Sequence, residues 1–472
     1  MFIKKSKYVQ YLAALTASLT IGSNTAYVTW SSPILPQLTS KNSPIGVQIT
    51  NAEASWVVSI ILLGGIVTCP FSASFVKKFG PRRSLLFSSI FIMLPWIPIT
   101  LANSVWILYI SRFIAGMATG TITAGVTIYN SEIADQEIRG KLGTAFTIMK
   151  LMGHFVVLTF GPFVSYQVLC VICGVMPLIC FCTIYFMPES PYYLLKIGEK
   201  HRAKESLAIL GSDELNENDL ERKMNEIEKV VNEDMRNKSG MVELFRNPRY
   251  RKGLLTMTGV KVLHSMSGTV AIESYMQSII GSSSSSISPE ISSIIFGAIQ
   301  FPAAFLASAI VDKLGRKPLL IISAFGCALA LISEGIYFYI QDVLKSDLKN
   351  ISWIPTTGII VFLISTPLGV SSLPYVLMGE LFPVNIKESA ITLIIFYGVS
   401  MSFVVSKFYQ PVLEMWGLYT VFWIFGGVCL AGMVFVWCVV PETKGKSFGD
   451  IQIKLNRSKN KNNLDKIENL EG

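Results

Sequence analysis

The chain has 472 residues, of which 51% are hydrophobic and only 15% are charged, and its formal net charge is +9. A soluble domain usually carries about 25% charged residues, so this composition, with a mean hydropathy of +0.50, excludes an ordinary soluble protein. The sequence also offers no nucleophile–base set, metal-ligand cluster or phosphate-binding loop. We therefore expect no enzyme, no cofactor or metal site, and no nucleic-acid partner.

Twelve apolar segments are long enough to cross a membrane, which takes a helix of about 20 residues. The first six lie near residues 8–30, 54–76, 84–103, 106–130, 142–163 and 166–187. A polar interval at 188–252 follows, with the alternating charges of a solvated helix. The last six lie near residues 253–281, 291–312, 318–341, 354–378, 388–411 and 417–440. The pattern predicts an all-α integral membrane protein with twelve transmembrane helices in two six-helix bundles.

The spans divide the chain into an N-terminal bundle (1–187), a linker with short helices (188–252), a C-terminal bundle (253–441) and a tail (442–472). Cations gather in alternate loops, and the positive-inside rule then places the linker, the tail and both termini in the cytosol. The loops on the other side hold only Lys41, Lys345, Lys349 and Lys407. An odd number of helices would destroy this asymmetry. We expect a multi-pass plasma-membrane protein that is monomeric in the lipid bilayer.

All eight cysteines lie inside apolar runs, where we expect small buried hydrophobic residues. Cys170 and Cys173 form a CxxC pair, but no second pair or histidine cluster accompanies it, so we expect no metal or redox site. Asn350 begins a glycosylation sequon in a predicted outside loop.

Three features recur in the same order in both halves, which indicates an internal duplication. They are a basic turn after the second span (80–83 and 315–317), a glutamate followed seven residues later by a cation (Glu132 with Arg139, Glu380 with Lys387), and a Pro-Glu pair at the end of each half (188–189 and 441–442).

A duplicated membrane protein of this kind can move a solute by rocking its halves about a central site, so that one side opens while the other closes. Carboxylate–cation pairs at the cytosolic end could bridge the halves when that end is closed and separate when it opens. The alternative is that these cations only set the topology.

Five motifs resemble those of the sugar porter family of the major facilitator superfamily, and the resemblance covers about residues 10 to 450. Similar to the family's motifs are Arg112–Gly120 (RxxxGxxxG), Tyr129–Gly140 (YxxEIxxxxxRG), Pro188–Pro191 (PESPR), Gly379–Pro383 (ELFP) and Pro441–Ser447 (PETKGRS). Two further segments, Trp30–Pro33 and Leu373–Glu380, are similar to insect facilitated trehalose transporters.

The resemblance implies a cytosolic gate built from the duplicated charges. Its members would be Arg82, Arg83, Glu132, Arg139, Glu189, Asp312, Arg316, Glu380, Lys387 and Glu442. One departure is clear. The acid three residues before the turn glycine is present as Asp312 in the second half but replaced by Lys77 in the first, so the first-half gate would be looser or balanced differently.

The resemblance also implies a solute path, in which neutral amides, hydroxyls and an aromatic ring read a sugar without the desolvation penalty of full charges. The family's positions fall on Asn24, Thr147, His264, Ser265, Ser267, Gln300, Tyr375 and Ser402. Several of these replace glutamine, asparagine or tryptophan. Each lost polar contact is worth roughly 1 kcal/mol, so we expect an altered solute or weaker hexose binding.

Ionisable residues inside apolar spans are candidate functional groups. Lys150 and Lys261 lie near enough to the cytosolic ends of their helices to extend towards water, and Glu273 is expected near the outer end. His264 best combines depth with a path position. The alternative for His264 is a hydrogen bond to a neighbouring helix. His154 and Glu334 complete the set.

Proton coupling in the family is associated with an acid in the first helix, and here Asn24 stands in its place. The resemblance therefore implies facilitated diffusion of a sugar, such as trehalose or a hexose, rather than symport. Two alternatives remain open: transport of another small neutral solute, and a non-transporting solute sensor on the same scaffold.

Overall fold

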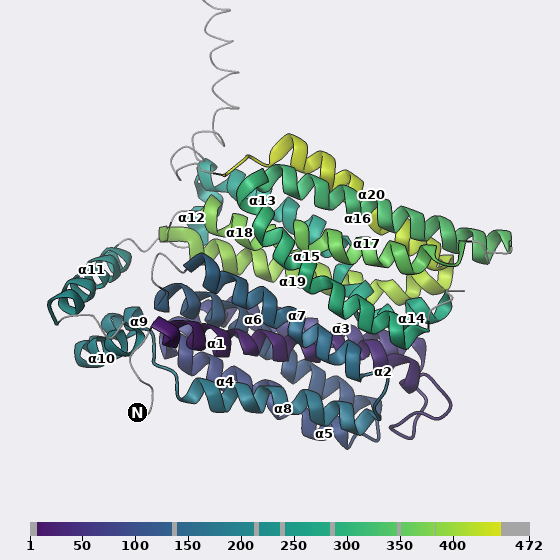
Figure 1. Cartoon of the computed structure of the whole chain (residues 1–472), viewed down its shortest axis with the longest axis horizontal. Helices are drawn as coiled ribbons and strands as arrows, with labels where there is room; N and C mark the ends of the chain where they lie inside the picture. Colours follow the sequence, from purple (N-terminus) through teal and green to yellow (C-terminus); the bar gives the residue numbers. More distant parts are fainter. Residues whose placement is uncertain are drawn as a thin grey trace, which may run out of the picture.

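The structure is a computed structural model that describes residues 7–134, 139–211, 217–236, 241–283, 288–346, 351–382 and 384–444. Within these ranges the chain is helical and contains no strand. The helices run side by side in an elongated bundle, and a group of short helices projects from one end (Figure 1). We call this end the linker end and the opposite end the far end.

The first half contains six membrane-crossing units built from eight helices. They are α1 (Lys7–Thr29), α2 (Ser31–Leu38), α3 (Asn51–Phe79), α4 (Pro81–Met93), α5 (Trp96–Thr100), α6 (Val105–Ile133), α7 (Arg139–Phe160) and α8 (Tyr166–Tyr185).

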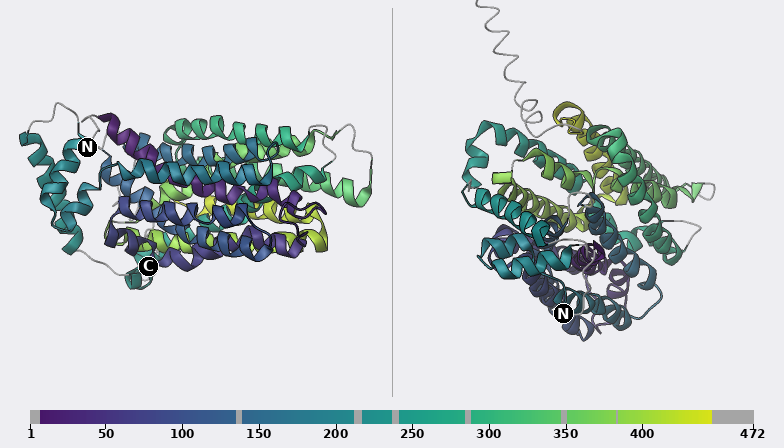
Figure 2. Two further views of the ribbon diagram at one scale, coloured as in Figure 1. Left: turned by 90° about the horizontal axis from the view of Figure 1, so that it is seen from below. Right: turned by 60° about the vertical axis from the view of Figure 1, so that its left-hand side comes forward.

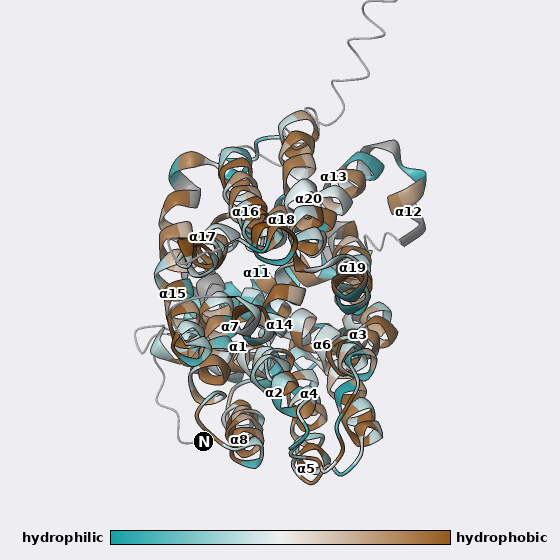
Figure 3. Cartoon of the chain, turned by 90° about the vertical axis from the view of Figure 1, so that its right-hand side faces the viewer, coloured by the Kyte–Doolittle hydropathy of each residue, from teal (hydrophilic) through white to brown (hydrophobic). Residues whose placement is uncertain are grey.

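The second half repeats this plan. Its helices are α13 (Pro248–Met266), α14 (Thr269–Ser282), α15 (Pro289–Leu314), α16 (Arg316–Tyr339) with the π-helical turn η1 (Ile340–Leu344), α17 (Ile354–Leu368), α18 (Leu373–Leu381), α19 (Val384–Trp416) and α20 (Leu418–Val439). Viewed along the helix axes, the two halves form two groups, one above the other (Figure 3).

Four short helices connect the halves at the linker end: α9 (Pro191–Lys196), α10 (Lys200–Leu210), α11 (Glu217–Arg236) and α12 (Met241–Arg246). Leu194, Leu195 and Ala203 form a small core of their own beneath α11. The Gln10 side chain donates to the Leu210 carbonyl at 2.8 Å, so the start of α1 lies against the linker (Figure 2).

The structure confirms the helical membrane fold but breaks several predicted spans. Nine helices of the described chain are long and apolar enough to cross a membrane, and the remaining three units are α1, α7 and the pair α13–α14. Three spans predicted as continuous are interrupted, at residues 94–95, 267–268 and 369–372. Such breaks keep backbone groups satisfied only where protein covers them.

Two smaller expectations were wrong. Lys407 lies inside α19 rather than in an outside loop. Of the eight cysteines, Cys182 and Cys438 are exposed, while the other six are buried as expected.

The halves meet along two helix pairs, α3 with α19 and α7 with α15, and at the far end through α2 and α14. There the backbone N–H of Gln277 donates to Ser32 Oγ at 3.3 Å. The rings of Phe155 and Phe301 also meet across the α7–α15 contact, with centroids 5.7 Å apart.

Two glycines at the linker end adopt backbone angles that other residues avoid. Gly80 ends α3 with φ 88° and ψ 150°, and Gly315 precedes α16 with φ 92° and ψ 172°. A Cβ atom at Gly80 would lie 2.9 Å from Glu189 Oε2, and one at Gly315 would lie 2.8 Å from Glu442 Oε2. Both turns therefore need glycine for conformation and for space.

We predict that Gly80→Ala and Gly315→Ala each destabilise the protein. The backbone angles alone should remove about 1–3 kcal/mol, and the contact with the carboxylate adds to this. Gly198→Ala is the matched control, because Gly198 has a φ of +82° but no neighbour within 4 Å of an added Cβ. The check is the melting temperature of the purified protein in detergent. Equal losses in all three variants would contradict the role of the carboxylates.

Candidate functional site

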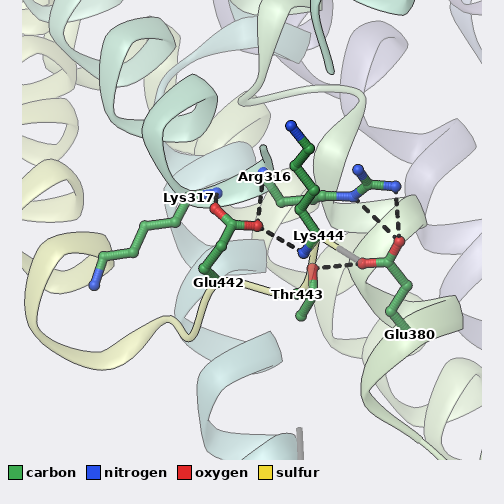
Figure 4. Close-up of polar contacts among 6 residues, drawn as sticks. All are labelled: Arg316, Lys317, Glu380, Glu442, Thr443 and Lys444. Atoms are coloured by element: carbon green, nitrogen blue, oxygen red, sulfur yellow. Dashed lines mark hydrogen bonds and ion pairs between the residues drawn. The ribbon is translucent and has the colours of Figure 1, made fainter. Parts of the chain in front are cut away.

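The last residues of the second half cap the helix that follows its basic turn. Glu442 accepts hydrogen bonds from the backbone amides of Arg316 at 3.1 Å and Lys317 at 3.0 Å, the first residues of α16, and from the Lys444 amide at 2.8 Å. A carboxylate at a helix N-terminus satisfies free N–H groups and the helix dipole. Figure 4 shows these bonds.

Glu380 of α18 contacts residues next to this helix cap, namely Arg316 and Thr443. Its Oε1 accepts a hydrogen bond from Arg316 Nε at 3.2 Å and lies 3.1 Å from Arg316 Nη2, so two nitrogens of the guanidinium contact one carboxylate oxygen (Figure 4). Its Oε2 accepts from the Thr443 hydroxyl at 2.6 Å. We call Arg316, Lys317, Glu380, Glu442, Thr443 and Lys444 the second-half cluster.

The first half contains a matching group. Glu189 accepts from the backbone amide of Arg82, near the start of α4, at 3.0 Å. The Ser190 hydroxyl donates to Glu132 at the end of α6. The Arg82 guanidinium donates to the carbonyls of Ile184, at 3.2 Å, and Tyr185 at the end of α8. We call Arg82, Glu132, Glu189 and Ser190 the first-half cluster.

The two capping carboxylates differ in their electrostatic surroundings. Burial raises the pKa of Glu189 above its ordinary value, although the amides of Arg82 and Ser190 and the Arg82 charge oppose the shift. Burial would also raise the pKa of Glu442, but the amides of Lys444, Arg316, Lys317 and Thr443 outweigh it and lower the pKa.

The contacts just described each stay within one half. They therefore do not include the bridges between halves that a closed gate would need, and the gate role remains a prediction for these residues. Arg83 is exposed. The side chains of Arg139, Asp312 and Lys387 lie outside the described residues, as does Asn350.

In the interior, Tyr375 of α18 is the predicted path residue with the most open ring. It is 41% exposed, although it contacts helices of both halves. The Phe146 ring of α7 lies 6.1 Å away and the His264 ring of α13 lies 6.5 Å away, between centroids. The Lys261 ammonium lies 4.5 Å from the Tyr375 ring centroid and 3.4 Å from its hydroxyl.

Other predicted path residues are engaged in contacts within the second half. The carbonyl of Val370, in the break between α17 and α18, accepts from His264 Nδ1 at 3.1 Å, which is the alternative expected for this histidine. Ser265 donates to the Gly398 carbonyl at 3.1 Å, and Ser402 donates to Ser265 at 3.3 Å.

Two more predicted path residues of the second half also contact their own helices. The Ser267 hydroxyl donates to the His264 carbonyl at 2.8 Å, and the buried Gln300 amide donates to the Phe296 carbonyl at 3.4 Å. The sequence therefore placed these residues in the interior, but their polar atoms largely serve helix packing.

On the first-half side, Asn24 and Thr147 are half-buried. The Thr119 hydroxyl donates to Asn24 Oδ1 at 3.0 Å. Arg112 is fully buried, donates to the Tyr27 carbonyl at 3.2 Å, and places its guanidinium 5.6 Å from the Trp30 ring. These contacts of Arg112 involve a carbonyl and rings rather than an acid.

The sequence did not predict which ionisable residues meet. His154 Nε2 of α7 lies 3.4 Å from Glu273 Oε2 of α14, and His154 Nδ1 lies 2.6 Å from the Thr29 hydroxyl. Towards the far end, Lys407 donates to Ser55 at 2.7 Å and lies 4.1 Å from the Trp56 ring. The His154–Glu273 and Lys407–Ser55 contacts join the halves, and the polarity of single residues gave no signal for either pairing.

The remaining buried acid, Glu334, belongs to the second half. Its side chain on α16 is 1% exposed and lies against Gly358 of α17. A Cβ at Gly358 would lie 2.3 Å from its Oε1.

A cavity of about 620 Å³ opens between the halves at the far end. The stacked rings of Tyr275 and Tyr409, with centroids 4.4 Å apart, line it together with the amides of Asn51, Gln277 and Gln410. Amides beside aromatic rings suit a neutral hydroxylated molecule.

We predict opposite pH profiles for two charge-removing variants. The lowered pKa of Glu442 means that its stabilising charge is present above its ordinary pKa and is lost as the pH falls below about 4.5. Glu442→Gln should therefore cost about 1 kcal/mol at pH 7, allowing for solvent screening, and progressively less as the pH falls below the ordinary pKa of a glutamate.

The pKa of Glu189 is raised, so ionisation of its carboxyl group destabilises the folded protein as the pH rises. Glu189→Gln should leave the protein equally or more stable at pH 7, with the gain disappearing in acid. Melting curves in detergent between pH 4 and pH 8 check both variants. Parallel profiles for the two would contradict the difference between the caps.

The sequence matches a known protein family and several of its members. Residues 9–455 match the model of a family described as "Sugar (and other) transporter". The facilitated trehalose transporter Tret1 of Polypedilum vanderplanki is 30% identical over 454 residues, covering 95% of this chain and 88% of that protein. Tret1 of Apis mellifera ligustica is 29% identical over 453 residues, covering 94% and 88%.

Solved structures agree with the fold. The partially occluded, inward-open xylose transporter XylE from E. coli superposes with a TM-score of 0.75 at 21% identity, covering 93% of this chain and 99% of that chain. The proton:xylose symporter XylE bound to 6-bromo-6-deoxy-D-glucose gives 0.74 at 20% identity, covering 95% and 99%. At these identities the likeness shows the fold alone, which is the twelve-helix major facilitator arrangement.

Proposed function

This chain belongs to the sugar (and other) transporter family, and on that premise we propose that it carries a sugar across the plasma membrane by facilitated alternating access. Trehalose, the solute named for its relatives in Polypedilum and Apis, and hexoses are the first solutes to test. The chain is not an enzyme.

One observation carries this proposal: an exposed aromatic ring stands in the interior where the two halves meet. Tyr375 is 41% exposed, yet Phe146 of the other half lies 6.1 Å from it. A ring that is open to solvent between two duplicated bundles is suited to stack on a sugar.

The arrangement of contacts supports a rocking cycle. The halves touch at the far end through α2 with α14 and through Lys407 with Ser55, whereas the linker-end clusters hold contacts within their own halves. We take the linker end as cytosolic, with both termini inside, because the linker and the basic turns lie there. The bundles 1–187 and 253–441 would then move about the linker 188–252, in a monomer, with the duplicated charges as the gate.

The chemistry around the first helix supports uniport. Asn24 accepts a hydrogen bond from Thr119 and offers no proton to exchange. The nearby Arg112 contacts the Tyr27 carbonyl. A carrier without an acid here needs no proton gradient, so transport would run down the solute gradient in either direction.

The engaged hydroxyls of Ser265 and Ser402 favour a second candidate, a sensor that binds solute without moving it. Their mutual bond at 3.3 Å leaves fewer groups for a sugar than the family pattern provides. A sensor would bind solute and show no net flux.

The test is uptake into proteoliposomes that contain the purified full chain. We expect uptake and counterflow of trehalose or a hexose, and a protonophore should leave both unchanged. In Tyr375→Ala, uptake at low solute concentration should fall about tenfold or more, because the variant loses a stacking contact worth about 1.5 kcal/mol. Phe71→Ala is the control, because Phe71 is 70% exposed on the outer surface of α3. Solute binding without flux would show that the protein is a sensor and not a carrier. Loss of uptake in the presence of a protonophore would contradict uniport.

A further inference from the structure

Two lysines from opposite halves face the same interior point. Lys150 lies on α7 and Lys261 on α13. Lys261 contacts the Tyr375 ring directly, and the charges of both lysines act on His264 and on the Tyr375 hydroxyl.

The Lys261 side chain does not extend to the cytosol, contrary to the expectation from its place in the helix. It is 5% exposed, and its ammonium lies 4.5 Å from the Tyr375 ring centroid. Among the residues that the structure describes, neither Lys150 nor Lys261 has a carboxylate within ion-pair distance. Ammonium groups inside a membrane bundle are costly unless something pairs with them.

One carboxylate belongs to this neighbourhood but is already engaged. Glu273 interacts with Lys150 at longer range, while its closest ionisable partner is His154, at 3.4 Å. The Val370 carbonyl can only accept, so His264 carries a proton on Nδ1 and can be neutral. Leaving the histidines aside, two lysines and one glutamate carry a net charge of +1 (2 − 1).

The neighbouring helix makes room for this charge. A Cβ atom at Gly398 of α19 would lie 2.3 Å from Lys261 Cε and 2.9 Å from its Cγ. The absence of a side chain at Gly398 therefore leaves the space that the Lys261 stem occupies.

We propose that the central site takes a sugar acid, a polyhydroxylated molecule with one carboxylate, in preference to a neutral sugar. The carboxylate pairs with Lys150 and Lys261 and neutralises the surplus charge, while the sugar ring stacks on Tyr375. Charge-assisted hydrogen bonds are about twice as strong as neutral ones, so the pairing decides the preference. This inference rests on the proposed transport function and names its solute class.

The test compares glucose with glucuronate, which differ only in a CH₂OH against a carboxylate. Binding to the purified full chain in detergent is measured by thermal shift and titration calorimetry, and flux is measured in proteoliposomes. We expect glucuronate to bind at least about tenfold more tightly, the effect of one charge-assisted bond. Its uptake should rise when a potassium gradient with valinomycin makes the interior positive, because the carrier moves a net charge.

Substitutions at the two lysines and at Gly398 distinguish the effect of the positive charge from the effect of side-chain shape. Lys150→Gln and Lys261→Gln keep side-chain length and should each reduce glucuronate affinity about tenfold or more, with glucose binding unchanged or improved. Gly398→Ala retains the charge but displaces the Lys261 stem, and should reduce glucuronate affinity as well. Lys200→Gln is the control, because Lys200 lies on α10 with a side chain that is 61% exposed. If one lysine variant fails to fold, the other still decides.

Each outcome separates this inference from the proposed function. Glucuronate binding without flux would support the charged site and contradict the proposed carrier function. Transport of glucose or trehalose with no glucuronate binding, and no effect of the lysine variants, overturns the inference and leaves the carrier intact. Preference for glucose 6-phosphate over glucuronate also overturns it, because a single surplus charge predicts a monoanion. Binding of neither glucose nor glucuronate overturns it too.

Discussion

A carboxylate seated on the first amides of a helix organises each half of this protein. Glu189 caps α4 through the Arg82 amide, and Glu442 caps α16 through the amides of Arg316 and Lys317. These bonds tie the end of each six-helix unit back to its second and third helices. The turn glycines Gly80 and Gly315 leave the space that the carboxylates occupy. Each half is thus closed on itself at the linker end, which lets it move as one body.

The interior has a different electrostatic character from its ends. Arg112, Lys150 and Lys261 bring positive charge into the bundle, and aromatic rings and carbonyls surround two of them instead of acids. Glu273 and His154 form the ionisable contact that joins the halves there. Among the described residues these three cations have no carboxylate within ion-pair distance, which fits the anionic solute that we propose. The capping clusters give the halves rigidity, and the central charges give the path its chemistry.

Much of the architecture could be predicted from the sequence, because apolar length, loop charge and the repeated Pro-Glu ends are local signals. The helix breaks at residues 267–268 and 369–372 could not, since glycines like those at the breaks also occur inside continuous helices, such as Gly64 in α3 and Gly120 in α6. Path residues such as Tyr375 and Asn24 were placed in the interior, but the bond from Ser402 to Ser265 and the Val370 contact of His264 depend on helix rotation. The His154–Glu273 contact joins residues far apart in the chain, and no local pattern encodes it.

Alternating access requires the halves to separate at the far end during each transport cycle. Ser32 of α2 and Gln277 of α14 meet there. The direct measurement is solute flux through a Ser32→Cys/Gln277→Cys variant, with the exposed Cys182 and Cys438 replaced by serine. The two new thiols are bridged by oxidation or by a short bifunctional maleimide. The account predicts that the bridge stops flux in both directions, and that reducing an oxidised bridge restores it. Full flux through a quantitatively bridged protein would contradict alternating access at this contact.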